Sequence, residues 1–257
     1  MRISSSEDPF VARVPVTIVE GPPFPGMNHS DIRQQALFDA LDSRILVLDG
    51  AMGTMVQQRN LTAADFGGPH LEGCNENLVV TRPDVILDIH RAYFRAGADM
   101  VETDTFGGTP LVLAEYGLEE QAHQLNVAAA RLARQAAEEF STPGRPRFVA
   151  GSIGPTTKTI SVTGGITFTE LTRNFYAQAQ ALVEGGVDLL AIETCPDTRN
   201  IKAALLAVER LSTELGRSIP VIVSGTIERN GTMLAGQAAD ALYASVSHAG
   251  LLAIGLN

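Results

Sequence analysis

The sequence predicts an α/β fold in which parallel strands alternate with helices, and three apolar runs support this prediction. The first, over residues 45–48, is too short for a helix and ends in Asp49, so it is typical of a strand buried on both faces. Two later runs have the same design and reach Glu102 and Glu193. An ionised carboxylate is costly to bury without a partner. Acids at the ends of parallel strands therefore indicate an active site.

From residue 30 onward the expected helices and strands alternate strictly. Ser30 is the expected N-cap of a first helix that runs to about residue 42. The apolar face of this helix comprises Ile32, Leu37, Phe38 and Leu41. Gly97 and Gly216 follow two later helical patterns and are expected to end those helices. The remaining strands are expected at residues 45–51, 99–106, 147–153, 188–194, 220–227 and 251–257, and the remaining helices at 84–96, 119–140, 169–184, 198–215 and 237–249.

This alternation fits either an open doubly wound sheet or a (β/α)8 barrel. The glycine-rich dinucleotide fingerprint is missing after the first strand, where Asp49 would repel a pyrophosphate. Polar residues at the tips of several strands favour the barrel. We therefore expect residues 29–257 to form an incomplete barrel of about six βα units. Residues 1–28 are rich in proline and serine, and we expect them to be a disordered N-terminal extension, of which 1–26 are dispensable.

Composition narrows the class of function. Hydrophobic residues make up 45% of the 257 residues and charged residues 19%, which allows a substantial core. The formal net charge of −10 argues against nucleic-acid and anionic-membrane surfaces. We expect a cytoplasmic protein, because no apolar stretch is long enough to cross a membrane and no secretory segment is recognisable. Two cysteines, Cys74 and Cys195, do not suggest a disulfide framework.

Several short motifs recur at the expected strand ends in a specific order. They are the segments 49–55 (DGAMGTM), 102–106 (ETDTF), 151–156 (GSIGPT), 192–194 (IET), 224–227 (SGTI) and 255–257 (GLN). In order and spacing they resemble the homocysteine-binding, or homocysteine S-methyltransferase, domain of cobalamin-dependent methionine synthase over residues 45–257. The resemblance implies a TIM barrel that binds homocysteine and methylates its zinc-bound thiolate to methionine. Two alternatives remain: a stand-alone homocysteine S-methyltransferase using betaine or S-methylmethionine, and a non-catalytic fragment.

The resemblance also has implications for cofactors. The zinc ligands of the family are three cysteines, the first of which directly follows a Gly-Leu-Asn sequence. That triplet ends at Asn257 here, so the expected ligands lie beyond it, and we expect no metal ligand and no turnover from this chain alone. Cobalamin and methyltetrahydrofolate would be bound by later domains, which would be its partners in a full-length enzyme. Cys74 and Cys195 match no ligand position, and we expect both to be inert small residues.

By resemblance, the amino-acid half of the site lies within this chain. Glu193 would hold the homocysteine ammonium with Asp49 beside it, since carboxylates suit an ammonium group. The Gly50 N–H and Thr105 would approach the substrate carboxylate. The expected second shell consists of Asp104, Ser224 and Asn257. No residue is a convincing catalytic base.

Structural roles for the same residues remain open. Asp49 could cap the following turn, and Glu193 could pair with an arginine. Thr105 could merely satisfy local backbone groups, and Asp104 could hydrogen-bond a neighbouring loop. Asp104 also departs from the family pattern, which usually has Asn there, and segment 73–77 resembles its counterpart only loosely.

Overall fold

The computed structural model describes residues 29–257, so the expected N-terminal extension, 1–28, lies outside the described residues. Five parallel strands form one sheet, and their order in space follows their order in the chain. A doubly wound sheet reverses its strand order at a switch point, whereas a barrel adds each strand on the same side. The fold is therefore of the (β/α) barrel type, as expected. The strands are β1 (Met100–Glu102), β2 (Phe148–Ile153), β3 (Leu189–Cys195), β4 (Val221–Gly225) and β5 (Ala253–Leu256).

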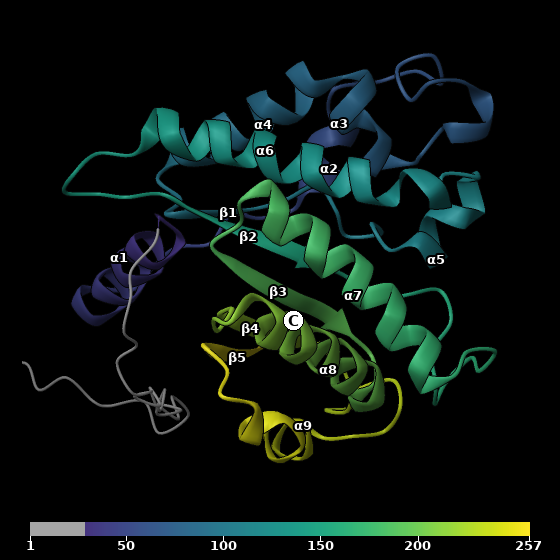
Figure 1. The fold of residues 1–257 in the computed structure, drawn as a ribbon. Coiled ribbons are helices and arrows are strands. Elements are labelled where there is room, and N and C mark those ends of the chain that lie inside the picture. The colour runs from purple at the N-terminus through teal and green to yellow at the C-terminus, as the bar shows by residue number, and fades with distance from the viewer. Residues whose placement is uncertain (1–28) are drawn as a thin grey trace, which may run out of the picture.

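Helices cover the outer face of the sheet (Figure 1). Helices α4, α6, α7 and α8 pack against one another in chain order, each beside the next. The helices are α1 (His29–Ser43), α2 (Met52–Gln57), α3 (Leu78–Thr81), α4 (Pro83–Ala96), α5 (Pro110–Leu113), α6 (Ala122–Phe140), α7 (Phe168–Gly185), α8 (Thr198–Leu215) and α9 (Ala239–Val246). None of the described helices combines the length and apolar character that crossing a membrane requires.

The ends of the long helices follow the local sequence. The side chain of Thr167 accepts a hydrogen bond from Glu170 N at 3.2 Å and the Glu170 carboxylate accepts one from Thr167 N at 2.9 Å, which makes a capping box at the start of α7. Gly97 ends α4 with φ +112° and Gly216 ends α8 with φ +65°. Glycine adopts this left-handed conformation without steric cost, so both predicted helix ends are confirmed.

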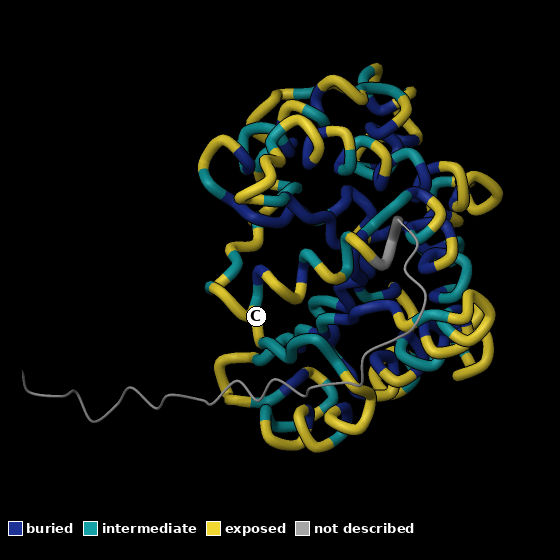
Figure 2. Tube along the Cα trace, turned by 60° about the vertical axis from the view of Figure 1, so that its left-hand side comes forward, coloured by how far each residue is buried: buried dark blue, intermediate teal, exposed yellow. Residues whose placement is uncertain are grey.

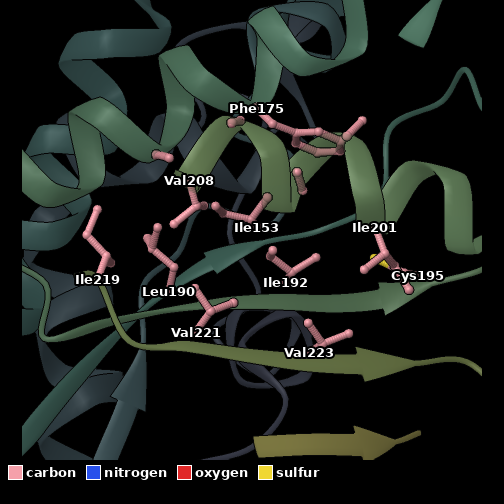
Figure 3. Packing of buried hydrophobic residues seen from close by; sticks show 14 of the residues in the cluster. Ile153, Phe175, Leu190, Ile192, Cys195, Ile201, Val208, Ile219, Val221 and Val223 are labelled. Carbon is pink, nitrogen blue, oxygen red and sulfur yellow. The ribbon is translucent and has the colours of Figure 1, made fainter. Parts of the chain in front are cut away.

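Alternate strand residues face opposite sides of the sheet and build two cores. On the outer side, Leu190, Ile192 and Val223 are fully buried against α7 and α8 (Figure 3). On the inner side, small residues such as Ala150 and Ala191 leave room for α1, whose Leu37 joins their cluster. Helix α1 therefore lies beside the end of the sheet at which the strands begin (Figure 1), and its Leu37 packs against the inner-side residues there.

One predicted strand is much reduced. Segment 45–51 contributes only a parallel bridge between Leu48 and Met100, and Ile45 is 89% exposed. The prediction that this strand is buried on both faces is wrong. The segment lies at the edge of the sheet beside β1, and the described residues place no strand on its other side. Apolar composition alone does not reveal how many neighbours a strand has.

The first helix also differs from expectation. It begins at His29, so Ser30 lies inside it and is not its N-cap. Ile32 is 56% and Phe38 38% exposed, because the helix faces the core mainly through Leu37 and Ala40. The short helices α2, α3 and α5 were not expected, since four to six residues are too few for a periodic pattern. Figure 2 shows buried segments gathered within the fold and exposed ones on its outer turns.

Candidate active site

Two carboxylates meet where the edge segment and β1 end. Asp49 N donates to Met100 O at 3.0 Å, which ties the segment to β1. Glu102 N donates to Asp49 Oδ1 at 3.0 Å, so the Asp49 carboxylate lies against the last residue of β1. Burial and the nearby Glu102 carboxylate raise the pKa of Asp49 to about 8, against the lowering effect of the Glu102 N–H.

Glu193, on β3, brings a third carboxylate into the same electrostatic environment. Burial and then Glu193 raise the pKa of Glu102 to about 8. Burial likewise raises the pKa of Glu193. Within the described part of the chain, none of these three acids forms an ion pair with Lys, Arg or His. The arrangement is therefore a cluster of carboxylates suited to receive a cation.

Hydroxyl groups fix the orientation of Glu193. Ser152 Oγ donates to Glu193 Oε1 at 2.5 Å, and Thr194 Oγ1 lies 3.4 Å from Oε2. Thr194 has φ +55°, which is unusual for a β-branched residue and indicates local strain. Asn257 Nδ2 donates to Thr194 Oγ1 at 2.7 Å, and Thr226 Oγ1 donates to Asn257 Oδ1 at 3.1 Å. Asn257 thus links the tips of β3, β4 and β5 through the threonine that contacts Glu193.

Thr105 belongs to a closed ring of hydrogen bonds. Its hydroxyl donates to Ser152 O at 2.7 Å and contacts Thr103 Oγ1 at 2.6 Å, while Ser152 N donates to Thr103 Oγ1 at 3.0 Å. Each hydroxyl has one proton, so the Thr103 hydroxyl donates to Thr105. The Thr105 proton is therefore engaged by the protein, and its expected contact with a substrate carboxylate would require the hydroxyl to turn.

The remaining expected residues lie in different surroundings. Gly50 N donates to no group in the described region, so this N–H is open to a ligand. Ser224 is half-buried on β4, in register with Gly255 of β5. Asp104 is buried after β1, and its Oδ2 has no hydrogen-bond partner among the described residues. Burial and the nearby Glu76 carboxylate raise the pKa of Asp104 well above its usual value.

The structure adds functional candidates to the site residues that the resemblance implies. Glu102 supplies the third carboxylate, and Ser152 orients Glu193. Glu76 accepts a hydrogen bond from Gly107 N at 2.6 Å and lies near Asp104. Glu102 and Ser152 both occur in strand-end motifs, so their position at a strand tip was the available signal.

The described residues do not by themselves form a zinc site. They contain no group of three or more His, Cys, Asp or Glu side chains that could hold a metal ion. Cys74 and Cys195 are buried, and burial with nearby carboxylates raises the pKa of both thiols to about 12. Neither thiol belongs to a group of possible metal ligands among the described residues.

Polar residues at the carboxyl ends of consecutive parallel strands define a (β/α) barrel of the enzyme type. The chain belongs to the homocysteine S-methyltransferase family, whose model matches residues 46–257.

Solved structures of the homocysteine methyltransferase MmuM from Escherichia coli have a similar fold. The metallated form has 27% identity over 88% of this chain and 77% of that chain, with a TM-score of 0.71. The oxidized form has 29% identity over 88% of this chain and 76% of that chain, with a TM-score of 0.70. The apo form has 27% identity over 84% of this chain and 73% of that chain, with a TM-score of 0.65. The family and these neighbours assign homocysteine methylation as the general activity.

Proposed function

We propose that this chain binds homocysteine for methylation to methionine, in the manner of methionine synthase. The observation that carries the proposal is the cluster of Asp49, Glu102 and Glu193, three inward carboxylates without a counter-cation in the described region. An amino-acid ammonium supplies the missing charge and several hydrogen-bond donors.

Each group has a distinct role in this proposal. Glu193 and Asp49 accept hydrogen bonds from the ammonium, and Ser152 holds Glu193 in the required orientation. Glu102 adds negative charge next to Asp49. The Gly50 N–H donates to the ligand carboxylate, with Thr105 beside it. Because burial raises the pKa of Asp49 and Glu102 to about 8, binding of the cationic ligand is accompanied by proton release.

In the reaction itself, the homocysteine sulfur forms a bond to the donor methyl carbon as the bond from that carbon to the donor breaks. The thiol proton leaves before or during attack, because the thiolate is the nucleophile. Zinc in this family, and methylcobalamin and methyltetrahydrofolate on other domains, belong to the proposed methionine synthase chemistry. The described residues do not assemble a zinc site, so their own contribution is to bind and orient the substrate.

A stand-alone homocysteine S-methyltransferase is the second candidate. The Escherichia coli structures that match over about three quarters of their length carry the name homocysteine methyltransferase. The residues of segment 51–55 (AMGTM) resemble methionine synthase better and favour it instead. Methyl transfer to homocysteine from methylcobalamin, betaine or S-methylmethionine, measured as methionine formed by the full-length protein, distinguishes the two candidates.

Binding tests the substrate proposal without requiring turnover. We expect L-homocysteine to bind, as measured by calorimetry under reducing conditions, and to bind more tightly as the pH rises from about 6 to 8. The analogue 4-mercaptobutanoate lacks the ammonium and should bind at least tenfold more weakly. In Glu193→Gln, loss of one partner of a buried charge pair is expected to cost about 2 kcal/mol, or roughly 30-fold in Kd.

Glu184→Gln is the matched control, because Glu184 is exposed at the end of α7 and contacts His123. It should bind homocysteine like the wild type. Equal affinity for the amine-free analogue, or equal binding by Glu193→Gln, would show that the carboxylate cluster does not recognise the ammonium.

A further inference from the structure

A cavity of about 270 Å³ lies at the end of the sheet opposite the carboxylate cluster. Asp188, which lines it, directly precedes β3, whereas Glu193 lies near the other end of that strand. Glu193 lies five positions after Asp188 along the strand, which corresponds to roughly 16 Å. Arg33 of α1, Arg134 of α6 and Arg217, which follows α8, also line the cavity. It is therefore a second polar site formed by four separate parts of the chain.

The cavity has an excess of positive charge. The Asp188 side chain is 1% exposed and accepts hydrogen bonds from Arg33 Nη2, from Arg134 Nη2 at 2.5 Å and from Val149 N at 2.8 Å. Arg217 forms no ion pair with any residue that the structure describes. Three guanidinium groups thus face one carboxylate, in a chain whose formal net charge is −10.

A second buried acid, directly before β1, shows an arrangement in which every surrounding arginine contacts the carboxylate. Asp99, which precedes β1, contacts Arg44, Arg145 and Arg147 directly. At Asp188 only two arginines contact the carboxylate, and the third lines the open space beside it. The need to neutralise Asp188 therefore does not explain why Arg217 also lines this cavity.

The donors that remain have the chemistry of an oxyanion site. A guanidinium group carries five N–H donors in a planar fork that matches carboxylate and phosphate groups. Among the described residues, Arg134 donates from Nε and Nη2 to Gly186 O and Asp188, and Arg33 donates only from Nη2. The volume is many times the roughly 10–15 Å³ that one water needs, and lies slightly below the range of about 300–1,000 Å³ for drug-sized ligands. This size fits a small anion.

We propose that the cavity formed by Arg33, Arg134 and Arg217 beside Asp188 binds a small oxyanion with two or more negative charges, such as a phosphate or a dicarboxylate. The bound anion connects α1, α6 and the segment after α8. Because it binds the folded state, it stabilises the fold in proportion to its concentration relative to Kd. This inference is independent of homocysteine binding, since the two sites lie at opposite ends of the sheet.

The test is calorimetric titration of the wild-type chain with inorganic phosphate and, separately, with succinate, at low ionic strength and neutral pH. Thermal unfolding at rising phosphate, with ionic strength held constant by sodium chloride, gives a second readout. We expect saturable binding of at least one of the two anions and a concentration-dependent rise in Tm. Binding of phosphate alone or succinate alone identifies the anion class.

The variant Arg217→Gln should weaken binding at least tenfold and abolish the anion-dependent rise in Tm. It should also fold, because Arg217 lacks an ion pair among the described residues and its backbone N–H to Ser212 O is retained. The matched control is Arg131→Gln, an exposed arginine on α6 that should leave binding unchanged. Absence of saturable binding of either anion up to about 10 mM, or equal weakening by both variants, would overturn the proposal.

Discussion

The ion cluster around Asp99 is expected to hold the segment that presents Asp49. The Asp99 side chain is 1% exposed and accepts hydrogen bonds from Arg44 at 2.6 and 3.0 Å, Arg145 at 3.1 Å and Arg147 at 3.0 Å. It also accepts one from Val47 N at 3.1 Å. Asp99→Asn preserves the size of the side chain but removes its charge and replaces one accepting oxygen with an NH2 donor, so it tests the ion pairs together with their hydrogen bonds.

The magnitude depends mainly on Arg147. The side chains of Arg44 and Arg145 are 35% and 48% exposed, so water screens much of their loss. Arg147 is 8% exposed and would be left as a buried charge without its counter-ion. Breaking one partner of a buried pair costs about 3–5 kcal/mol. For a chain of this size we expect a fall in Tm of roughly 10 °C.

Urea unfolding followed by circular dichroism measures the change in free energy. The control is Asp88→Asn, because Asp88 is 58% exposed and contacts Arg91 only at 3.4 Å, and we expect a change within about 0.5 kcal/mol. A loss below about 1 kcal/mol for Asp99→Asn would refute the assigned role.

Acid unfolding of the wild type gives an independent measurement. Burial alone would raise the pKa of Asp99, but hydrogen bonds from Arg44, Val47 N and Arg145 outweigh it and lower the pKa to about 2. The folded-state pKa lies below the unfolded value of about 3.8, so this contribution is present above pH 4 and is lost as the pH falls toward 2.

Two further predictions concern the candidate site. The pKa of Asp49 is raised from 3.8 to about 8 in the folded state, so its contribution to stability is fully present below about pH 4 and is lost as the pH rises toward 8. Asp49→Asn keeps an acceptor for Glu102 N but cannot ionise. Its free energy of unfolding in urea, relative to that of the wild type, should therefore increase between pH 5 and 8. An unchanged difference between the two proteins would contradict the raised pKa. Gly154→Ala places a Cβ 2.5 Å from Phe106 O, so we expect the free energy of unfolding to fall by about 2–3 kcal/mol. The control Gly144→Ala meets open space and should be neutral or slightly stabilising. Similar unfolding curves for the two variants would show that the close approach at Gly154 is not needed.

Much of the fold could be predicted from local patterns. Helical periodicity located α4, α6, α7 and α8, and Gly97 and Gly216 marked two of their ends. The strand positions were also found, although β1 is shorter than expected and segment 45–51 forms only a bridge. These failures have one cause, because the number of neighbours that a strand acquires is decided by distant parts of the chain.

The candidate site was predictable in its positions but not in its contacts. Asp49 and Glu193 were selected from strand-end motifs, while Glu102, in one of the same motifs, was not. The engagement of the Thr105 hydroxyl by Ser152 O depends on the register between β1 and β2, which the sequence does not display.

The sequence by itself determined the alternation of strands and helices, the positions of the polar strand ends and the helix stops, because each depends on residues close together in the chain. Only the tertiary structure decided that Asp49, Glu102 and Glu193 face one another, and that Arg33, Arg134 and Arg217 surround one cavity. Groups separated by tens of residues meet only once the parallel strands have been placed in order. Their electrostatics then follow from burial and proximity, which are properties of the folded chain.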